Sequence, residues 1–259
     1  MSNKQKESAL IVSQQCIAAD IYSMWIQTEK IATLAVPGQF ISMYTKDGSK
    51  LLPRPISLCE IDREAGSLRI VYRTVGKGTE EFSKACAGDT LDILGPLGNG
   101  FPMEEIRGKR VLMMGGGIGV PPMLQTAKEA DADVTIISGY RSADLFLVKE
   151  LEAAGRLFIT TEDGSVGTKG NVMDAIRENH IEPEVILACG PTPMLRAVKA
   201  YAEEKKITCY ISLEEKMACG IGACLACVCQ SKEVDGHSHV HNKRICKDGP
   251  VFLSTEVEL

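Results

Sequence analysis

Three cysteines late in the sequence, Cys219, Cys224 and Cys227, follow the spacing C-x4-C-x2-C, and Cys246 comes after eighteen further residues. This is the plant-type spacing for a two-iron, two-sulfur cluster, which needs four thiolates from a tight loop and a distant strand. The glycines and alanines between the cysteines let the backbone wrap closely and direct N–H groups at sulfur. The pattern therefore predicts a 2Fe–2S cluster. A structural zinc site, usually built from two C-x2-C pairs, and buried reduced thiols are the alternatives.

Other possible metal ligands lie close to these cysteines. Cys229 stands two residues after Cys227, and we interpret it as a non-ligand, because strand alternation would aim it at the site only by displacing Cys227. His237, His239 and His241 share the loop GHSHVHN, and Rieske centres do use two histidines. Because four cysteines already complete a cluster, we interpret this loop as solvated.

The composition is that of an ordinary globular protein, with 259 residues, 44% hydrophobic and 24% charged. This length suits two domains, or two with an appendage. A net charge of −5 and a pI near 5.5 argue against a nucleic-acid partner. The polar start MSNKQKESALIV and the lack of a long apolar run predict a cytoplasmic protein without a membrane span. Ten cysteines then indicate metal or redox use.

The first part of the chain has the pattern of short strands separated by turns. Residues 9–18, 21–28, 39–45, 55–61, 67–75 and 89–96 are rich in β-branched and aromatic residues, and PG, DG, AG and GD separate them. Only residues 79–85 have a helical pattern. Six such strands predict a small antiparallel β-barrel.

Two short motifs within this barrel invite a chemical interpretation. Arg54, Pro55, Ile56 and Ser57 place a guanidinium and a hydroxyl at a strand start, where they could meet a phosphate and the edge of a flavin ring. Residues 75–79, VGKGT, lead directly into the helical stretch and offer backbone N–H groups to a pyrophosphate. A capped turn is the alternative explanation of each motif.

From residue 109 onward the pattern changes to alternating strands and helices. The strands are expected at 111–116, 134–140, 157–163, 184–190 and 208–213, and the helices at 121–130, 144–155, 172–180 and 192–206. This alternation predicts a parallel, doubly wound sheet with right-handed crossovers. Ligands of such sheets bind beyond the carboxyl ends of the strands.

A glycine-rich loop follows the first of these strands, with Gly115, Gly116, Gly117 and Gly119 in GGGIGV. It is not the full dinucleotide fingerprint, because Val120 takes the last glycine position and no acid ends the next strand. It can still admit a pyrophosphate close to the backbone.

Two later strand ends also suit a nicotinamide cofactor. Glu162 and Asp163 follow the third strand and would repel a 2′-phosphate, which favours NADH over NADPH; a turn with solvated acids is the alternative. Cys189 ends the fourth strand in ACGPTPM. Its polarisable side chain could lie against a nicotinamide ring, or could be a buried small hydrophobe.

The order of these motifs carries a resemblance over essentially the whole chain. A barrel with RPIS and G-x-G-T, a nucleotide-type domain with GGGIG and CGPTPM, and then C-x4-C-x2-C resemble the ferredoxin-reductase superfamily. Within it, EEKMACGIGACLACVC and ICKDGPVF are most similar to the electron-transfer subunits of type B dihydroorotate dehydrogenases. The resemblance implies an FAD-binding β-barrel at 1–102, an NAD-binding α/β domain at 103–212 and a 2Fe–2S segment at 213–259.

The resemblance also implies roles for individual residues. The expected FAD contacts are Arg54, Pro55, Ile56, Ser57, Val71, Tyr72, Arg73, Gly78 and Thr79. The expected NAD contacts are Gly115, Gly116, Gly117, Gly119, Cys189, Gly190 and Pro191. The expected cluster ligands are Cys219, Cys224, Cys227 and Cys246. Ile56 stands where many relatives have an aromatic residue that stacks on the flavin.

The implied activity is electron transfer between NAD(H) and a partner. A flavin connects the two-electron chemistry of NADH to a one-electron cluster. The sequence shows no residue set for oxidising dihydroorotate, and the family assigns that step of pyrimidine biosynthesis to a separate FMN-bearing catalytic subunit. The resemblance also implies a heterotetramer with two copies of each chain.

Two other functions are compatible with these motifs. One is the diaphorase subunit of an NADH-dependent ferredoxin:NADP oxidoreductase or sulfide dehydrogenase, which resembles this chain in all three parts. The other is a metal-binding regulatory module without catalysis. The ending ICKDGPVF favours the dihydroorotate dehydrogenase subunit over the diaphorase, and bound flavin with inorganic sulfide would exclude the regulatory module.

Overall fold

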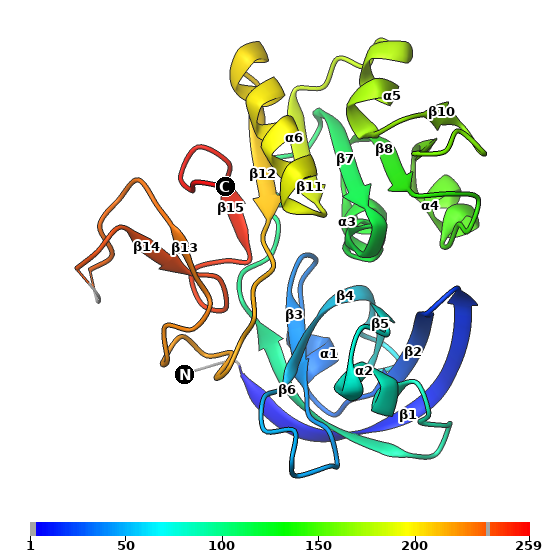
Figure 1. The fold of residues 1–259 in the computed structure, drawn as a ribbon, viewed down its shortest axis with the longest axis vertical. Helices are drawn as coiled ribbons and strands as arrows, with labels where there is room; N and C mark the ends of the chain where they lie inside the picture. Colours follow the sequence, from blue (N-terminus) through cyan, green and yellow to red (C-terminus); the bar gives the residue numbers. More distant parts are fainter. Residues whose placement is uncertain (1–3, 237–238) are drawn as a thin grey trace. The chain divides into compact units, whose positions relative to one another are not determined.

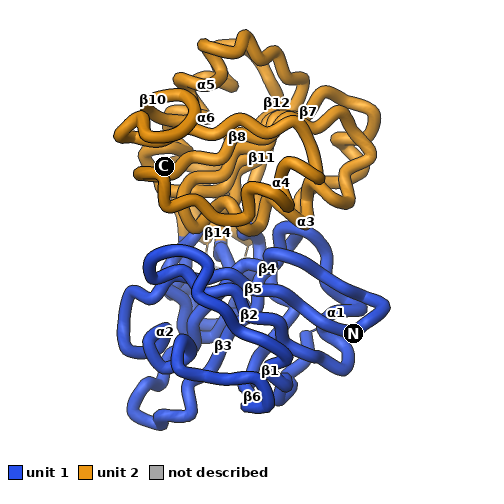
Figure 2. Tube along the Cα trace, turned by 90° about the vertical axis from the view of Figure 1, so that its right-hand side faces the viewer, with its two compact units in different colours: residues 1–100, 214–228, 244–250 blue, residues 101–213, 229–243, 251–259 orange. Residues whose placement is uncertain are grey.

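The structure is a computed structural model that describes residues 4–236 and 239–259. The chain forms two compact units, shown in different colours in Figure 2. The first contains residues 1–100, 214–228 and 244–250, and the second contains residues 101–213, 229–243 and 251–259. The C-terminal segment that we expected as a separate region is therefore divided between the units, and all four candidate cluster cysteines belong to the first.

The first unit is built on a closed barrel of six antiparallel strands (Figure 1), which confirms the expected fold. The strands are β1 (Gln5–Ala18), β2 (Ile21–Gln27), β3 (Phe40–Met43), β4 (Arg54–Asp62), β5 (Ser67–Arg73) and β6 (Thr90–Leu97), in the order β1-β2-β5-β4-β3-β6. Two short helices, α1 (Ile31–Leu34) and α2 (Lys77–Phe82), join them. We had predicted only the second helix.

The barrel interior fixes which side chains face outward. Ile41 and Met43 of β3, and Tyr72 of β5, belong to the buried cluster inside the barrel. Because side chains alternate along a strand, Ser42 and Val71 lie on the outer face. This alternation decides which residues of the predicted motifs can meet a ligand outside the barrel.

The second unit contains a mostly parallel sheet with the strand order β10-β9-β8-β7-β11-β12-β15. Its strands are β7 (Arg110–Gly116), β8 (Asp133–Tyr140), β9 (Arg156–Thr161), β10 (Thr168–Lys169), β11 (Val185–Cys189), β12 (Thr208–Ser212) and β15 (Val251–Leu253). A 3-10 turn, η1 (Gly117–Gly119), follows β7, and the helices are α3 (Pro121–Glu129), α4 (Val148–Ala154), α5 (Val172–Glu178) and α6 (Thr192–Lys205). Helix α3 packs beside α4, and α5 packs beside α6. The predicted α/β domain is confirmed, with β15 added as an antiparallel edge strand.

The helix that we expected at 144–155 begins only at Val148. Leu147, just before it, has a left-handed φ of 61°. A right-handed helix cannot include a residue with this φ, so the helix begins after Leu147. In addition, the Tyr140 hydroxyl donates a 2.7 Å hydrogen bond to the Phe146 carbonyl, and the two rings pack edge to face. These contacts hold the segment before α4 in a non-helical conformation.

The remaining strands, β13 (Val228–Gln230) and β14 (Asn242–Arg244), form a separate two-stranded sheet. Within the parts of the chain that the structure describes, no helix combines the length and the apolar character needed to cross a membrane.

Candidate functional site

The cysteine-bearing loop lies directly on the outer side of the barrel. A Cβ atom added to Gly220 would lie 3.1 Å from Ser42 Oγ and 3.2 Å from Leu97 Cδ1. Gly220 also has a positive φ of 67°, which favours glycine. The loop backbone therefore packs tightly against β3 and β6, and a side chain at this position would require its neighbours to shift.

The segment that carries Cys246 is anchored to the same barrel. The Asn99 backbone N–H donates to the Gly249 carbonyl at 2.7 Å, and its side-chain amide donates to the Asp248 carbonyl at 3.1 Å. A Cβ atom at Gly98 would lie 2.4 Å from Pro250 Cδ. Both cysteine-bearing segments of the first unit are thus fixed to strand β6 or to the residues that follow it.

The four candidate ligands lie as two pairs. The Cys224 side chain contributes to the lowered pKa of Cys219, and the Cys227 side chain contributes to the raised pKa of Cys246, so each side chain lies close to its partner. The Cys246 backbone N–H also lies 3.4 Å from Cys227 Sγ. Burial and the contact with Cys227 raise the pKa of Cys246 to about 12. Among the described residues, no group of three or more His, Cys, Asp or Glu side chains could hold a metal ion. Two pairs fit a two-iron cluster better than one tetrahedral ion, because each iron takes two protein ligands.

Backbone N–H groups are directed at Cys219. Ala223 N and Ile221 N donate to Cys219 Sγ at 3.3 Å and 3.5 Å. Burial opposes ionisation of this thiol, but the Ile221 N–H, the Cys224 thiol and the Ala223 N–H outweigh it and lower the Cys219 pKa to about 6. A thiolate ligand needs such donors, so the loop fits the group that its spacing predicted.

A buried arginine that was not among the predicted site residues joins the two segments. Arg244 is 5% exposed; its Nε donates to Asp248 Oδ2 at 3.0 Å, and its Nη1 donates to the Gly222 carbonyl at 3.2 Å. Gly222 belongs to the first cysteine segment and Asp248 to the second. The signal in the sequence was an arginine two residues before Cys246, together with an acid, Asp248, four residues after that arginine.

The neighbouring candidate ligands have other contacts. Cys229 lies in β13 and its thiol donates to the Lys243 carbonyl at 3.5 Å. His241 Nδ1 lies 3.0 Å from the Lys232 carbonyl, and His239 is exposed. His237 lies outside the described residues. The interpretation of Cys229 and of this loop as non-ligands stays a prediction.

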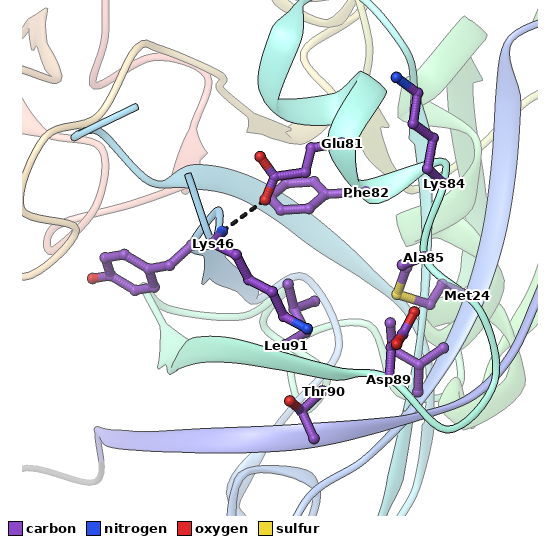
Figure 3. Close-up of a pocket in the computed structure, with 11 residues that line it drawn as sticks. Met24, Lys46, Glu81, Phe82, Lys84, Ala85, Asp89, Thr90 and Leu91 are labelled. Atoms are coloured by element: carbon purple, nitrogen blue, oxygen red, sulfur yellow. Dashed lines mark hydrogen bonds between the residues drawn. The ribbon is translucent and has the colours of Figure 1, made fainter. Parts of the chain in front are cut away.

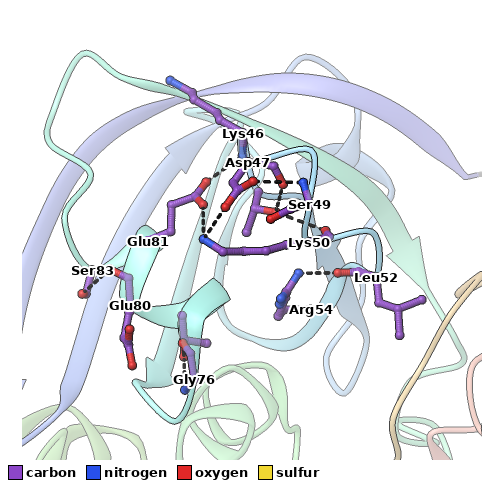
Figure 4. A network of polar contacts seen from close by, with 12 residues as sticks. Lys46, Asp47, Ser49, Lys50, Leu52, Arg54, Gly76, Glu80, Glu81 and Ser83 are labelled. Carbon is purple, nitrogen blue, oxygen red and sulfur yellow. Dashed lines mark hydrogen bonds and ion pairs between the residues drawn. The ribbon is translucent and has the colours of Figure 1, made fainter.

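The two motifs assigned to FAD lie in contact, although Gly78 stands 24 positions after Arg54 in the sequence. A Cβ atom at Gly78 would lie 2.1 Å from Arg54 Nε, so the guanidinium lies against the glycine backbone. Arg54 Nη1 also donates to the Leu52 carbonyl (Figure 4). A guanidinium beside the N–H groups of a first helical turn fits a pyrophosphate.

Thr79 has a structural role at the start of α2. Its hydroxyl accepts hydrogen bonds from Val75 N at 2.9 Å and Gly76 N at 3.2 Å, and donates to the Gly76 carbonyl at 2.9 Å. The alternative explanation of residues 75–79, a capped turn, therefore applies to the Thr79 side chain. The cap orders the turn that holds Gly78 against Arg54.

A polar network fixes the loop beside this motif (Figure 4). Lys50 Nζ lies 2.8 Å from Glu81 Oε2 and 3.3 Å from Asp47 Oδ2. The Lys46 N–H also donates to Glu81 Oε1 at 2.6 Å. The network connects residues 46–50 to helix α2, next to Arg54.

The other predicted FAD residues divide between the two faces of the barrel wall. Tyr72 is 1% exposed, its hydroxyl donates to Gln14 Oε1 at 2.7 Å, and Ile56 packs against the interior cluster. Pro55 pairs with Ser42 in register and therefore faces outward with it. Ser57 lies two residues after Pro55 on β4 and therefore shares its outer face. On β5, Val71 and Arg73 are also two residues apart and both lie on the outer face. Tyr72 can thus offer a flavin outside the barrel only its backbone, whereas the Ile56 side chain is half-buried.

The two motifs assigned to NAD also lie in contact. A Cβ atom at Gly119 would lie 2.2 Å from the Cys189 carbonyl oxygen, and one at Gly116 would lie 2.6 Å from Met194 Sδ and 3.0 Å from Pro191 Cδ. The loops after β7 and β11 are therefore packed backbone to backbone at the carboxyl end of the sheet. Cys189 is fully buried, which matches the buried alternative for its side chain. Sequence reasoning had not singled out Met194.

The acids after β9 have different environments. Asp163 Oδ1 accepts hydrogen bonds from the Ser165 hydroxyl at 2.6 Å and from the Ser165 N–H at 2.9 Å, and these bonds lower the Asp163 pKa. Asp163 therefore caps a turn. Glu162 is exposed.

The first unit also has a pocket of about 200 Å³ (Figure 3). Its apolar lining includes Met24, Phe82 and Leu91, and charged side chains of Lys46 and Asp89 also line it. None of the predicted FAD residues lines this pocket.

Comparisons with known proteins agree with this geometry. Residues 214–258 match the model of the iron-sulfur cluster binding domain of dihydroorotate dehydrogenase B, and residues 113–200 match the oxidoreductase NAD-binding domain. The chain is 44% identical to the dihydroorotate dehydrogenase B (NAD(+)) electron transfer subunit of Listeria monocytogenes serotype 4a (strain HCC23), over 96% of this chain and 97% of that protein. It is 42% identical to the subunit of the same name from Geobacillus sp. (strain WCH70), over 98% and 99%.

Solved structures show the same fold. A chain from the structure of an NADH-dependent reduced ferredoxin-NADP oxidoreductase has a TM-score of 0.86 at 32% identity, and the match covers 97% of this chain and 90% of that one. A ferredoxin NADP+ reductase from Neisseria gonorrhoeae with bound FAD and NADP has a TM-score of 0.64 at 18% identity, covering 79% and 92%. The latter likeness concerns the fold alone.

The barrel, the parallel sheet and the cysteine pairs define an oxidoreductase of the ferredoxin-reductase type that uses FAD, NAD and an iron–sulfur cluster. More narrowly, the chain belongs to the family of dihydroorotate dehydrogenase B electron transfer subunits, which its near full-length relatives share. The resemblance found in the sequence is thus confirmed.

Proposed function

We propose that this chain passes electrons between NAD(H), FAD and a 2Fe–2S cluster, to or from the FMN of a dihydroorotate dehydrogenase catalytic subunit. It would thereby support the NAD-linked oxidation of dihydroorotate to orotate in pyrimidine biosynthesis. The observation that carries this proposal is the placement of the cysteine loop on Ser42 of β3, which pairs with Pro55 of the RPIS motif. Neighbouring strands are only about 4.8 Å apart. The FAD motif and the cysteine loop therefore lie close together on the outer face of the barrel.

When bound, the cofactors supply hydride exchange at nicotinamide, conversion between two-electron and one-electron transfer at FAD, and one-electron transfer at the cluster. The chain's own residues bind and orient these groups. Arg54 and the first turn of α2 would hold the FAD pyrophosphate, and Pro55 with Ser57 would line the outward face beside the ring. The packed glycine loops after β7 and β11 would admit NAD close to the backbone.

The proposed partner is an FMN-containing catalytic subunit, in a complex with two copies of each chain, and we place this complex in the cytoplasm, where reduced thiols persist. The cysteine loop exposes apolar side chains, with Ile221 45% and Leu225 39% exposed. Apolar residues around an electron exit suit a protein interface better than water. We therefore place the partner contact on this loop.

A Leu225→Glu variant tests this function. It should keep its flavin, its cluster and its NADH-to-dye activity, but bind the FMN subunit at least about tenfold more weakly, because the interface would bury an unpaired charge. NAD-linked dihydroorotate oxidation should fall with the loss of the complex. Gel filtration with the partner and the two activity assays give the measurement.

Leu34→Glu is the matched control, because Leu34 is similarly exposed at 37% but lies in α1. It should bind the partner normally. Unchanged complex formation by Leu225→Glu would place the interface elsewhere. Loss of the cluster would show that Leu225 belongs to the packing of the loop.

The diaphorase function is a second candidate, favoured by the 32% identity over 97% of this chain to a chain of the ferredoxin-NADP oxidoreductase structure. The dihydroorotate dehydrogenase subunits are more similar, at 44% and 42%. Mass spectrometry of proteins that co-purify with the native chain distinguishes the two functions, because only the dihydroorotate dehydrogenase function predicts an FMN-containing catalytic subunit as the partner.

A further inference from the structure

Ser42 has a buried hydroxyl without a protein partner. The residue is 0% exposed, and among the described residues its Oγ has no hydrogen-bond partner. A hydroxyl removed from water and left unpaired is costly in a folded protein. Such a group in a native fold calls for an explanation, for example a bound group that the protein chain alone does not supply.

The surroundings of Ser42 indicate what that group is. Its side chain leaves the outer face of β3, between Pro55 of β4 and Leu94 of β6 in register. A Cβ atom at Gly220 would lie 3.1 Å from its Oγ. The hydroxyl therefore faces the backbone of the cysteine loop at the residue next to Cys219.

We propose that the Ser42 hydroxyl donates a hydrogen bond to sulfur of the 2Fe–2S cluster on its Cys219 side, and thereby raises the reduction potential of the cluster. This inference rests on the proposed function, which places the cluster on these cysteines. The reduced cluster carries one more negative charge than the oxidised cluster, so a donor near its sulfur stabilises the reduced form more. Hydrogen bonds to the sulfurs are among the features that set the potentials of such clusters.

Two other buried hydroxyls, of Ser138 and Thr160, also have no partner among the described residues. Both belong to strands β8 and β9 of the other unit, which holds none of the four cluster cysteines. Ser42 is the one of these three that faces the cysteine loop. The unpaired hydroxyl of Ser42 therefore lies against the loop that carries three of the candidate cluster ligands.

The test is an anaerobic redox titration of the purified holoprotein, followed by EPR for the cluster and by absorbance for the flavin. Ser42→Ala should lower the equilibrium constant for cluster reduction about tenfold, which for one electron is about 59 mV toward negative potential. Ser42→Thr keeps the hydroxyl and should keep the potential. Ser67→Ala is the control, because Ser67 is a buried serine on β5, which does not border β3, and it should leave the potential unchanged.

Iron, acid-labile sulfide and flavin are counted in each variant. An unchanged cluster potential in a fully loaded Ser42→Ala protein would overturn the inference. A shift of the flavin potential alone would also overturn it and assign the hydroxyl to FAD. Resonance Raman spectra add a second readout, because the deuterium shift of the iron–sulfur bands should be smaller in Ser42→Ala. Absence of iron and sulfide from the unmodified protein would instead contradict the proposed function.

Discussion

Replacing Cys219 by serine should remove the EPR signal of the cluster and lower NAD-linked dihydroorotate oxidation more than about a hundredfold, since even outer-shell partners of metal ligands are worth about 10–100-fold. The same loss is expected for Cys224, Cys227 and Cys246, which complete the two pairs. Flavin content and NADH-to-dye activity should persist, because the FAD motifs lie on β4, β5 and α2. Iron and sulfide assays with EPR after dithionite reduction give the measurement.

The matched control is Cys229→Ser. This cysteine lies in the same segment, but its thiol donates to the Lys243 carbonyl, so its replacement should leave the cluster signal intact. A lost signal in Cys229→Ser, or a retained one in Cys227→Ser, would contradict the ligand assignment.

Gly78→Ala should weaken FAD binding at least about tenfold, because the added methyl group would displace the guanidinium that we propose to make charge-assisted hydrogen bonds to the FAD phosphate. The new Cβ would lie 2.1 Å from Arg54 Nε. Gly78 has no positive φ, so alanine adds no backbone strain and the contact alone is tested. Fluorescence titration of the flavin-free protein with FAD measures the change.

Gly48→Ala controls for the added methyl group, since a Cβ at Gly48 would meet nothing within 4 Å. It should bind FAD as the unmodified protein does. Equal FAD affinity in Gly78→Ala and Gly48→Ala would show that Arg54 does not hold the pyrophosphate from this position.

Local patterns in the sequence predicted much of the fold. Segments rich in β-branched and aromatic residues, with turn signals between them, predicted all six barrel strands, and the alternation of strand and helix patterns predicted the parallel sheet. The helix before Gly155 was predicted too long, since the pattern of residues 144–147 is helical while Leu147 is held at positive φ by its surroundings. A pattern of this kind cannot show a tertiary contact that overrides local preference.

The sites were predictable to the extent that their chemistry is local. Cysteine spacing indicated a cluster because a loop of fixed length must bring its thiolates together. The contact between Arg54 and Gly78, and the link from Arg244 to Gly222, join residues more than twenty positions apart. Tyr72 was expected at FAD, but which face of the wall its side chain takes depends on the barrel register.

The central claim is that electrons from NADH reach the cluster through the flavin of this chain. The most direct measurement is anaerobic addition of NADH to the purified protein, with absorbance and EPR recorded together. The account predicts that the flavin absorbance bleaches first and that the EPR signal of a reduced 2Fe–2S cluster then develops, a signal that Cys227→Ser lacks. Flavin bleaching without any cluster signal in the unmodified protein, or bound zinc in place of iron and sulfide, would contradict it.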